Sequence, residues 1–296
     1  MRRPRNALVP VQGSPALKIV DSKGNGGLVI SDLHLGFETA LSEKGIIVPS
    51  QNENLLESII ALGRREKASR LIFIGDVKAS ESKTYPEEWQ QIPYFFDRLI
   101  AEGFSVDVIP GNHDGGLELM LPSGVDFHSA RGMIIELANG DEVGLFHGHA
   151  WPAPELFSCE FLVIGHNHWA VELRDNMGAR VRQPVWVISK VNGKALAKAF
   201  LDSSSMPYSD PEAAFKEKFG ETPADSTLIS MPAFNPFLRG RPINSRLGDE
   251  GYGLGPLLKG KIISIEEAEV FLLDGTYLGK VSQLPHSLFL GRRSSF

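Results

Sequence analysis

The chain has 296 residues, of which 42% are hydrophobic and 22% are charged. These proportions are ordinary for a folded globular protein and exclude an intrinsically disordered chain and a collagen-like fibre. With 30 Lys and Arg against 36 Asp and Glu, the formal net charge is -6, which excludes a protein that coats nucleic acid through overall basicity.

The cysteine content and the apolar runs exclude further classes. Cys159 is the single cysteine, so the chain has neither an internal disulfide framework nor a cysteine-based zinc site. No apolar run approaches the roughly 18 residues that a membrane helix needs, and the basic start lacks the apolar block of a secretory signal. We expect a cytoplasmic protein with no membrane partner, in which residues 1–16 form a flexible N-terminal tail.

Short apolar runs alternate with helical patterns in the first half of the chain. Five runs, each followed by glycine and a polar cluster, predict buried strands within residues 27–36, 70–76, 104–114, 142–150 and 161–168. Residues 50–68 predict a helix capped by Ser50, and residues 87–103 predict a second helix in which Pro93 requires a kink or a late start. This alternation favours a sheet with helices on its faces.

The second half predicts a mostly antiparallel sheet. Asn139-Gly140 indicates a hairpin within residues 132–146, and further strands are expected at 185–189, 226–234, 261–273 and 276–281. Residues 201–225 are rich in Ser, Pro and charge, which predicts a surface insertion with a short helix at 211–219. We expect a single α/β domain of the α+β kind over residues 1–296, with two sheets packed together and flanked by helices.

The predicted strands of the first 170 residues share one property, which is that potential metal ligands follow each of them. Six of the eight histidines lie in these five loops, together with carboxylate and carboxamide side chains. The residues are Asp32, His34, Asp76, Asn112, His113, His147, His149, His166 and His168. Loops at the carboxyl ends of strands converge on one crevice, so we expect these side chains to lie close together.

A donor set without thiolates suits Mn, Fe, Zn or Ni. Seven of these nine candidates already exceed what one tetrahedral ion requires and suffice for two divalent ions that share a bridging carboxylate. Two such ions clamp the attacking and leaving oxygens of a displacement at phosphorus, and water between them loses a proton near neutral pH to give a hydroxide nucleophile. The sequence therefore predicts two divalent ions, with manganese preferred, and hydrolysis of a phosphoester.

Five segments resemble the motifs of the calcineurin-like metallophosphoesterases. They are SDLHLG, GDV, GNHD, HGH and GHNH, and they occur in this order within residues 28–168. PVWVIS, LISMPAFNPFLRG and AEVFLLDGTYLG further resemble the SbcD-related phosphoesterases of prokaryotes. The resemblance implies a four-layer αββα sandwich with a binuclear centre. It implies that the first ion is held by Asp32, His34 and His168, the second by Asn112, His147 and His166, and that Asp76 bridges them.

The resemblance also implies roles for residues that are not ligands. His113 would act as a general acid on the leaving oxygen or stabilise the phosphoryl charge, and Asp114 would orient it. His149 is the alternative to His147 as a ligand, and otherwise a substrate-binding residue. In the family a second Asp pairs with the catalytic histidine, and in this chain Ala79 stands in its place. The catalytic pair is therefore incomplete or rebuilt.

Two basic residues near the motifs have alternative interpretations. Lys78 either meets phosphate or is a solvated surface lysine, and we favour the second. Arg239 in NPFLRG is a candidate for binding phosphate or a nucleic-acid backbone, and otherwise an exposed loop residue.

The sequence favours a metal-dependent phosphodiesterase or phosphomonoesterase. The first alternative is a DNA or RNA nuclease of the repair-exonuclease type, for which the net charge gives no support. The second alternative is a non-catalytic scaffold that retains the fold, and the complete ligand set argues against it.

Overall fold

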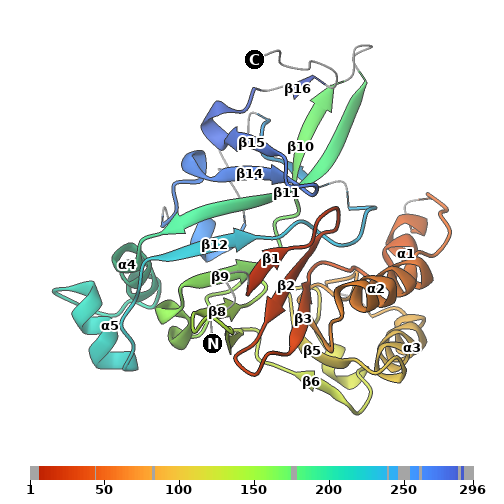
Figure 1. Cartoon of the computed structure of the whole chain (residues 1–296), viewed down its shortest axis with the longest axis horizontal. Coiled ribbons are helices and arrows are strands. Elements are labelled where there is room, and N and C mark those ends of the chain that lie inside the picture. Colours follow the sequence, from red (N-terminus) through yellow and green to blue (C-terminus); the bar gives the residue numbers. More distant parts are fainter. Residues whose placement is uncertain are drawn as a thin grey trace.

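The computed structural model describes residues 7–43, 45–81, 84–174, 179–238, 240–245, 254–259 and 262–285, and the backbone of 288–289. Two mixed sheets lie at the centre of the molecule, with helices α1 to α3 on one side and α4 and α5 on the other (Figure 1). This arrangement positions the loops that carry the candidate ligands.

The first sheet has six strands in the order β1-β2-β3-β4-β5-β6. Its strands are β1 (Leu8–Pro10), β2 (Ala16–Val20), β3 (Gly26–Ile30), β4 (Arg70–Ile74), β5 (Ser105–Ile109) and β6 (Val125–Phe127). β3 to β6 are parallel neighbours, whereas β1 and β2 pair antiparallel. The connecting helices are α1 (Phe37–Ser42), α2 (Asn52–Glu66), α3 (Glu88–Ala101) and a 3-10 turn at Leu117–Leu119.

The second sheet has ten strands. They are β7 (Met133–Glu136), β8 (Glu142–Leu145), β9 (Phe161–Ile164), β10 (Trp169–Arg174), β11 (Arg180–Val191), β12 (Ser226–Ser230), β13 (Arg241–Pro242), β14 (Glu269–Leu272), β15 (Tyr277–Lys280) and β16 (Leu288–Phe289). The central order is β13-β10-β11-β12-β9-β8-β7, with β14 beside β11, β15 beside β14 and β16 beside β10. β9 is parallel to both β8 and β12, so this sheet is mixed, but five of the nine strand pairings in its described part are antiparallel, as the prediction of a mostly antiparallel sheet requires.

Helices complete the second half of the chain. They are α4 (Gly193–Ser203), α5 (Pro211–Phe219) and α6 (Pro256–Lys259), with 3-10 turns at Pro154–Ser158, Ile265–Glu267 and Val281–Gln283. Among the residues that the structure describes, we find no helix with the length and apolarity to cross a bilayer.

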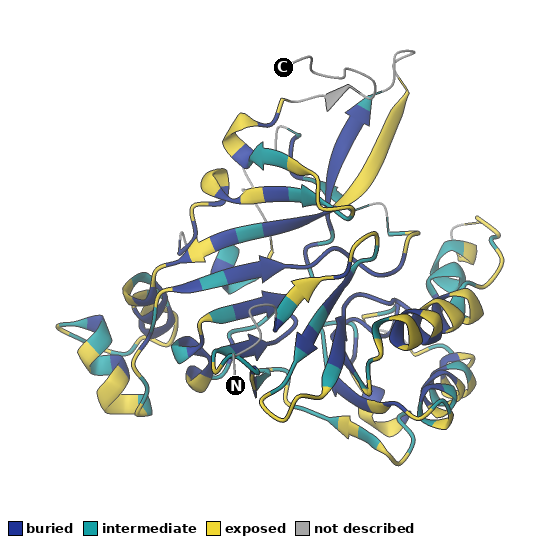
Figure 2. Cartoon of the chain, in the orientation of Figure 1, coloured by how far each residue is buried: buried dark blue, intermediate teal, exposed yellow. Residues whose placement is uncertain are grey.

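Apolar clusters between and outside the two sheets define four layers, which confirms the predicted αββα sandwich. On α2 the apolar residues recur at helical spacing, so that Leu56 and Ile59 bury against Phe73 of the first sheet. Between the sheets, Ile72 of β4 packs in one cluster with Val163 of β9. Other clusters cover the outer face of the second sheet beneath α4 and α5 and the end of the sheet that carries β10 and β14. Buried residues accordingly concentrate on the strands and the inward helix faces (Figure 2).

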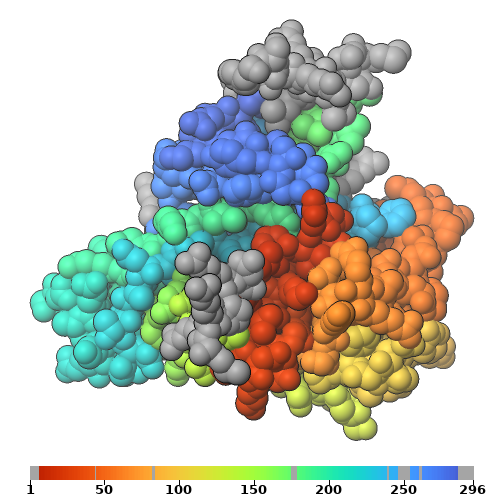
Figure 3. All heavy atoms as spheres, in the orientation of Figure 1, coloured from red at the N-terminus to blue at the C-terminus, as the bar shows by residue number. Residues whose placement is uncertain are grey.

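Residues 7–16 pair and pack with the rest of the chain, so the prediction of a flexible tail was wrong for this part of the segment. β1 pairs with β2, and the Gly13 N–H donates to the Leu273 carbonyl at 2.7 Å. Figure 3 shows this segment, in red, against the surface of β14 and β15, in blue. β1 has only three residues, which is too short for an alternating hydrophobic pattern to be recognised in the sequence. Residues 1–6 lie outside the described part of the chain.

Three local predictions have mixed outcomes. The short helix at 211–219 is confirmed as α5, but it is more than a surface insertion, because Phe215 is fully buried against Phe157 with ring centroids 4.8 Å apart. Ser50 does not cap α2, whose N-cap is Gln51. α3 begins at Glu88 and contains Pro93 in its interior, rather than starting late.

Candidate metal centre

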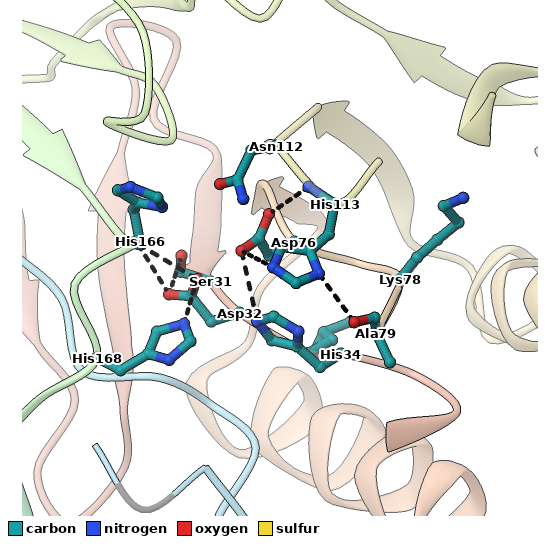
Figure 4. A network of polar contacts seen from close by, with 12 residues as sticks. Ser31, Asp32, His34, Asp76, Lys78, Ala79, Asn112, His113, His166 and His168 are labelled. Carbon is teal, nitrogen blue, oxygen red and sulfur yellow. Dashed lines mark hydrogen bonds and ion pairs between the residues drawn. The ribbon is translucent and has the colours of Figure 1, made fainter. Parts of the chain in front are cut away.

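Loops from both sheets bring the candidate side chains together in one cluster (Figure 4). Asp32 and His34 follow β3, Asp76 follows β4, and Asn112 and His113 follow β5. The second sheet supplies the three remaining ligand candidates, which are His147 after β8 and His166 and His168 after β9. Backbone bonds hold the loops in register, since the Asp32 N–H donates to the Gly75 carbonyl at 3.1 Å and the His34 N–H to the Asp76 carbonyl at 2.9 Å.

Asp76 lies at the centre of the cluster. Its Oδ1 is 3.2 Å from His147 Nε2, and its Oδ2 is 3.4 Å from His34 Nε2. The donor atoms form two groups, each within 4.8 Å, made of Asp32, His34, Asp76 and His168, and of Asp76, His147 and His166. Asp76 is thus the carboxylate that both groups share, with one oxygen toward each.

Asp32 anchors the first group. Its Oδ1 is 3.0 Å from His168 Nε2, while Ser31 Oγ donates to its Oδ2 at 2.6 Å and the His166 N–H donates to Oδ1 at 3.2 Å. A carboxylate that accepts several hydrogen bonds has a fixed orientation. These contacts therefore aim Oδ1 of Asp32 at the cluster.

Several buried polar atoms of the cluster lack a hydrogen-bond partner among the described residues. They are His34 Nε2, Asn112 Oδ1, His147 Nε2 and His168 Nε2. His147 Nδ1 faces the Ile74 carbonyl at 2.9 Å, and because a carbonyl only accepts, Nδ1 carries a proton and Nε2 is the nitrogen that faces Asp76. Nε2 of His147 lies 3.2 Å from Oδ1 of Asp76, and two lone pairs at this distance repel each other unless a proton or a cation lies between the two atoms. The donor set therefore fits divalent cations.

The electrostatics of the cluster also favour cation binding. Burial disfavours a charged His34 ring and lowers its pKa to about 4, and burial together with the neighbouring His147 lowers the pKa of His166 to about 4. Both rings are therefore neutral at pH 7 and can donate a lone pair. Burial also opposes charge on His147, but Asp76 and Asp32 outweigh it and raise its pKa to about 9, so that without a metal ion a proton lies on Nε2 toward Asp76, in the place that a divalent cation would take. In the same way, His147 outweighs burial and holds the pKa of Asp76 well below its usual range.

The backbone is strained at the residues that carry these donors. Asp32, His34, Asp76, His166 and His168 have φ between 45° and 67°, and they are five of the seven non-glycine residues with positive φ in the described part of the chain. Each such residue costs on the order of 1–3 kcal/mol, which persists only where the surroundings enforce it. Gly75 has φ 86°, and a Cβ on it would run into the His147 ring. Strain of this kind clusters at functional sites.

His113 lies beside the cluster and rests on the carbonyl of Ala79. Its Nδ1 is 2.8 Å from that carbonyl oxygen, and its Nε2 is 3.8 Å from Asp76 Oδ2. Ala79 therefore supplies through its backbone the acceptor that a side-chain carboxylate supplies in the family the chain resembles. The histidine ring has a fixed orientation although the second Asp is absent.

Glu81 is a site residue that the sequence did not reveal. Its Oε1 accepts a hydrogen bond from Asn112 Nδ2 at 2.7 Å and lies 3.2 Å from His113 Nε2. The first contact turns the Asn112 amide so that Oδ1 is the atom left to face the cluster. Glu81 belongs to a polar run, SESKTYPEE, that carries no motif, so no sequence signal distinguished it from a solvated loop residue.

Two predictions about neighbouring residues were wrong. Lys78 is 1% exposed rather than solvated, its Nζ donates to the Gly115 carbonyl at 2.8 Å, and its side chain points away from the cluster (Figure 4). The Asp114 carboxylate accepts from the backbone N–H groups of Gly111 at 2.8 Å and Lys78 at 3.0 Å, and no contact with the His113 ring is present among the described residues. Asp114 thus ties together the loops that carry Asp76 and His113.

His149 is a member of neither donor group. The ring of His149 is 5.4 Å from that of His147, and His147 rather than His149 reaches Asp76. Its substrate-binding role stays a prediction. Arg239 lies outside the described residues.

Known proteins similar to this chain include two solved structures. The nuclease MPE of Pseudomonas putida has a TM-score of 0.47 and 15% identity, covering 90% of this chain and 97% of its own. The phosphoesterase Yfce of E. coli has a TM-score of 0.33 and 22% identity, covering 50% of this chain and 72% of its own. No family model matches the chain, and no curated protein matches it. Because both similarities are weak, the fold assignment rests on the chain's own strand order and layers.

Proposed function

We propose that the chain is a metal-dependent phosphoester hydrolase with a centre of two divalent ions. The observation that carries this proposal is the position of Asp76, whose two oxygens face two separate groups of buried donor atoms. Paired ions that share a carboxylate are the arrangement that enzymes use for in-line displacement at phosphorus. The resemblance of the five motifs to the calcineurin-like metallophosphoesterases supports the same chemistry.

Each donor group has enough ligands for one ion. Asp32, His34, His168 and Asp76 would hold the first, and His147, His166, Asn112 and Asp76 the second. When bound, two divalent ions neutralise charge on the phosphoryl oxygens and lower the pKa of a coordinated water. Nitrogen and oxygen donors without thiolate suit manganese, which we propose as the first metal to test.

His113 would serve the leaving group. Its ring is fixed by the Ala79 carbonyl and lies beside Asp76 without belonging to either donor group. A ring in this position can give a proton to the departing oxygen or stabilise the charge on the phosphoryl group.

A substrate screen tests the proposed function. The full chain is supplied with manganese and assayed on bis-p-nitrophenyl phosphate, p-nitrophenyl phosphate, cyclic nucleotides and single-stranded DNA, each with and without a chelator. We expect chelator-sensitive hydrolysis of at least one ester. Absence of hydrolysis in protein that demonstrably holds manganese would support the scaffold alternative instead.

Glu81 should affect both metal affinity and catalysis, because it contacts Asn112 and His113. Replacing it with Ala removes both contacts, and we expect manganese affinity or activity to fall about 10- to 100-fold, as for other residues that orient a ligand. Glu81→Gln keeps an acceptor for Asn112 Nδ2 but loses the charge beside His113. It should restore metal affinity, measured by titration calorimetry, without restoring the full rate. Wild-type behaviour of Glu81→Ala would show that the contacts have no functional role.

A further inference from the structure

A wide cleft opens over the candidate metal centre. Its volume is about 1050 Å³, and its floor includes Asp76, Asn112, His113, His166 and His168. Small-molecule sites in proteins measure roughly 300–1,000 Å³, so the cleft could hold a drug-sized molecule. A phosphoryl group on the floor would fill a small part of it, and the rest is available to another part of the substrate.

One wall of the cleft is apolar and belongs to α1 and the segment after it. Phe37 and Leu41 are four residues apart on α1 and so lie on the same helix face. Both line the cleft, together with Ile46 and Val48. None of the six residues of α1, all of which the structure describes, is buried. The apolar face of this helix therefore borders the cleft instead of a hydrophobic core.

A second wall of the cleft is apolar as well. It is formed by Phe237, Leu238, Pro242 and Leu254. Phe237 is 41% exposed and Leu254 is 42% exposed, while Ile46 on the first wall is 51% exposed. Single exposed apolar residues are ordinary on protein surfaces, but a cluster of them around one cleft indicates a binding site.

We infer that these walls bind an apolar substituent, an alkyl chain or a ring, of the phosphoester whose phosphoryl group occupies the floor. This inference rests on the proposed function, because the metal centre fixes where the phosphoryl group lies. The apolar wall side chains offer no hydrogen-bonding group. Of the charged residues that also line the cleft, Glu81 contacts Asn112 and His113 of the floor, and Arg182 donates to the Gly240 carbonyl and lies 3.8 Å from Glu172. Against the apolar wall residues a polar substituent would lose water without compensation, whereas an apolar one gains from burial.

Alkylphosphonates test the inference, because they keep one phosphorus head group and vary only the apolar part. Affinities of methyl-, butyl- and hexylphosphonate for the manganese-loaded full chain are measured by titration calorimetry. A fully buried methylene is worth about fourfold in affinity. In a cleft that is open to solvent we expect about twofold per methylene, hence roughly thirtyfold from methyl to hexyl.

Two neighbouring isoleucines provide a matched pair of variants. Ile46 lines the cleft, whereas Ile47 is 90% exposed and does not. Ile46→Ser and Phe237→Ser should each reduce the advantage of hexylphosphonate severalfold and leave methylphosphonate unchanged, while Ile47→Ser should change neither. Equal affinities along the series, or equal behaviour of Ile46→Ser and Ile47→Ser, would overturn the inference. If the protein hydrolyses esters but shows no dependence on chain length, the inference fails while the proposed function stands.

Discussion

Asp76→Asn is expected to abolish phosphoester hydrolysis and to lower the occupancy of both metal sites. Asp76 is the residue that both donor groups share, and its oxygens lie 3.4 Å from His34 Nε2 and 3.2 Å from His147 Nε2. Replacing one oxygen with an amide nitrogen removes the charge and one of the two ligand atoms. Since metal ions contribute several kcal/mol to such reactions, we expect a loss of about a thousandfold or more in kcat/KM.

The metal content and the rate should be measured on the same preparations. Elemental analysis after dialysis against manganese gives occupancy, and circular dichroism confirms the fold. Asp126→Asn is a suitable control, because Asp126 is an exposed carboxylate on β6 of the same sheet. Wild-type rate and metal content in Asp76→Asn would rule out a bridging role, and loss of one ion alone would show that Asp76 serves a single site.

His113→Ala is expected to reduce the rate on poor leaving groups far more than it reduces metal content. Nε2 of His113 lies 3.8 Å from Oδ2 of Asp76, but His113 belongs to neither donor group. Removal of the ring should therefore leave both ions in place. Positioned acids contribute about 10²- to 10⁴-fold, and we expect a loss of that order on an alkyl ester. An ester of p-nitrophenol departs without protonation and should lose much less.

His128→Ala controls for the loss of a histidine elsewhere, since His128 contacts Asp107 at 2.7 Å and lies in neither donor group. It should alter stability without altering the dependence of rate on leaving group. If His113→Ala loses manganese in proportion to rate, His113 is a ligand. If both esters slow by the same factor, its role is to stabilise the phosphoryl charge.

The strands and the ligand loops could be predicted because they depend on local sequence. An apolar run that ends in glycine, such as RLIFIG, reports burial on both faces of a strand, and β4 lies at Arg70–Ile74 as expected. The hairpin across Asn139-Gly140 likewise forms between β7 and β8. In both cases the signal and the structure span the same few residues.

Other features depend on contacts between distant segments, and no local pattern reports them. Lys78 looks like any solvated lysine, yet the chain folds its ammonium onto the Gly115 carbonyl, 37 positions away. Glu81 reaches the site through Asn112, and its own segment has only the composition of an exposed loop. The candidate ligands could therefore be predicted from the sequence, whereas the residues that orient the ligand side chains could not.

The most direct test is the anomalous diffraction of crystals grown or soaked in manganese. Two peaks should appear with the carboxylate of Asp76 between them, one beside Asp32, His34 and His168 and the other beside Asn112, His147 and His166. Absence of peaks at these side chains, or a single peak that leaves one group of histidines without an ion, would contradict a two-metal centre.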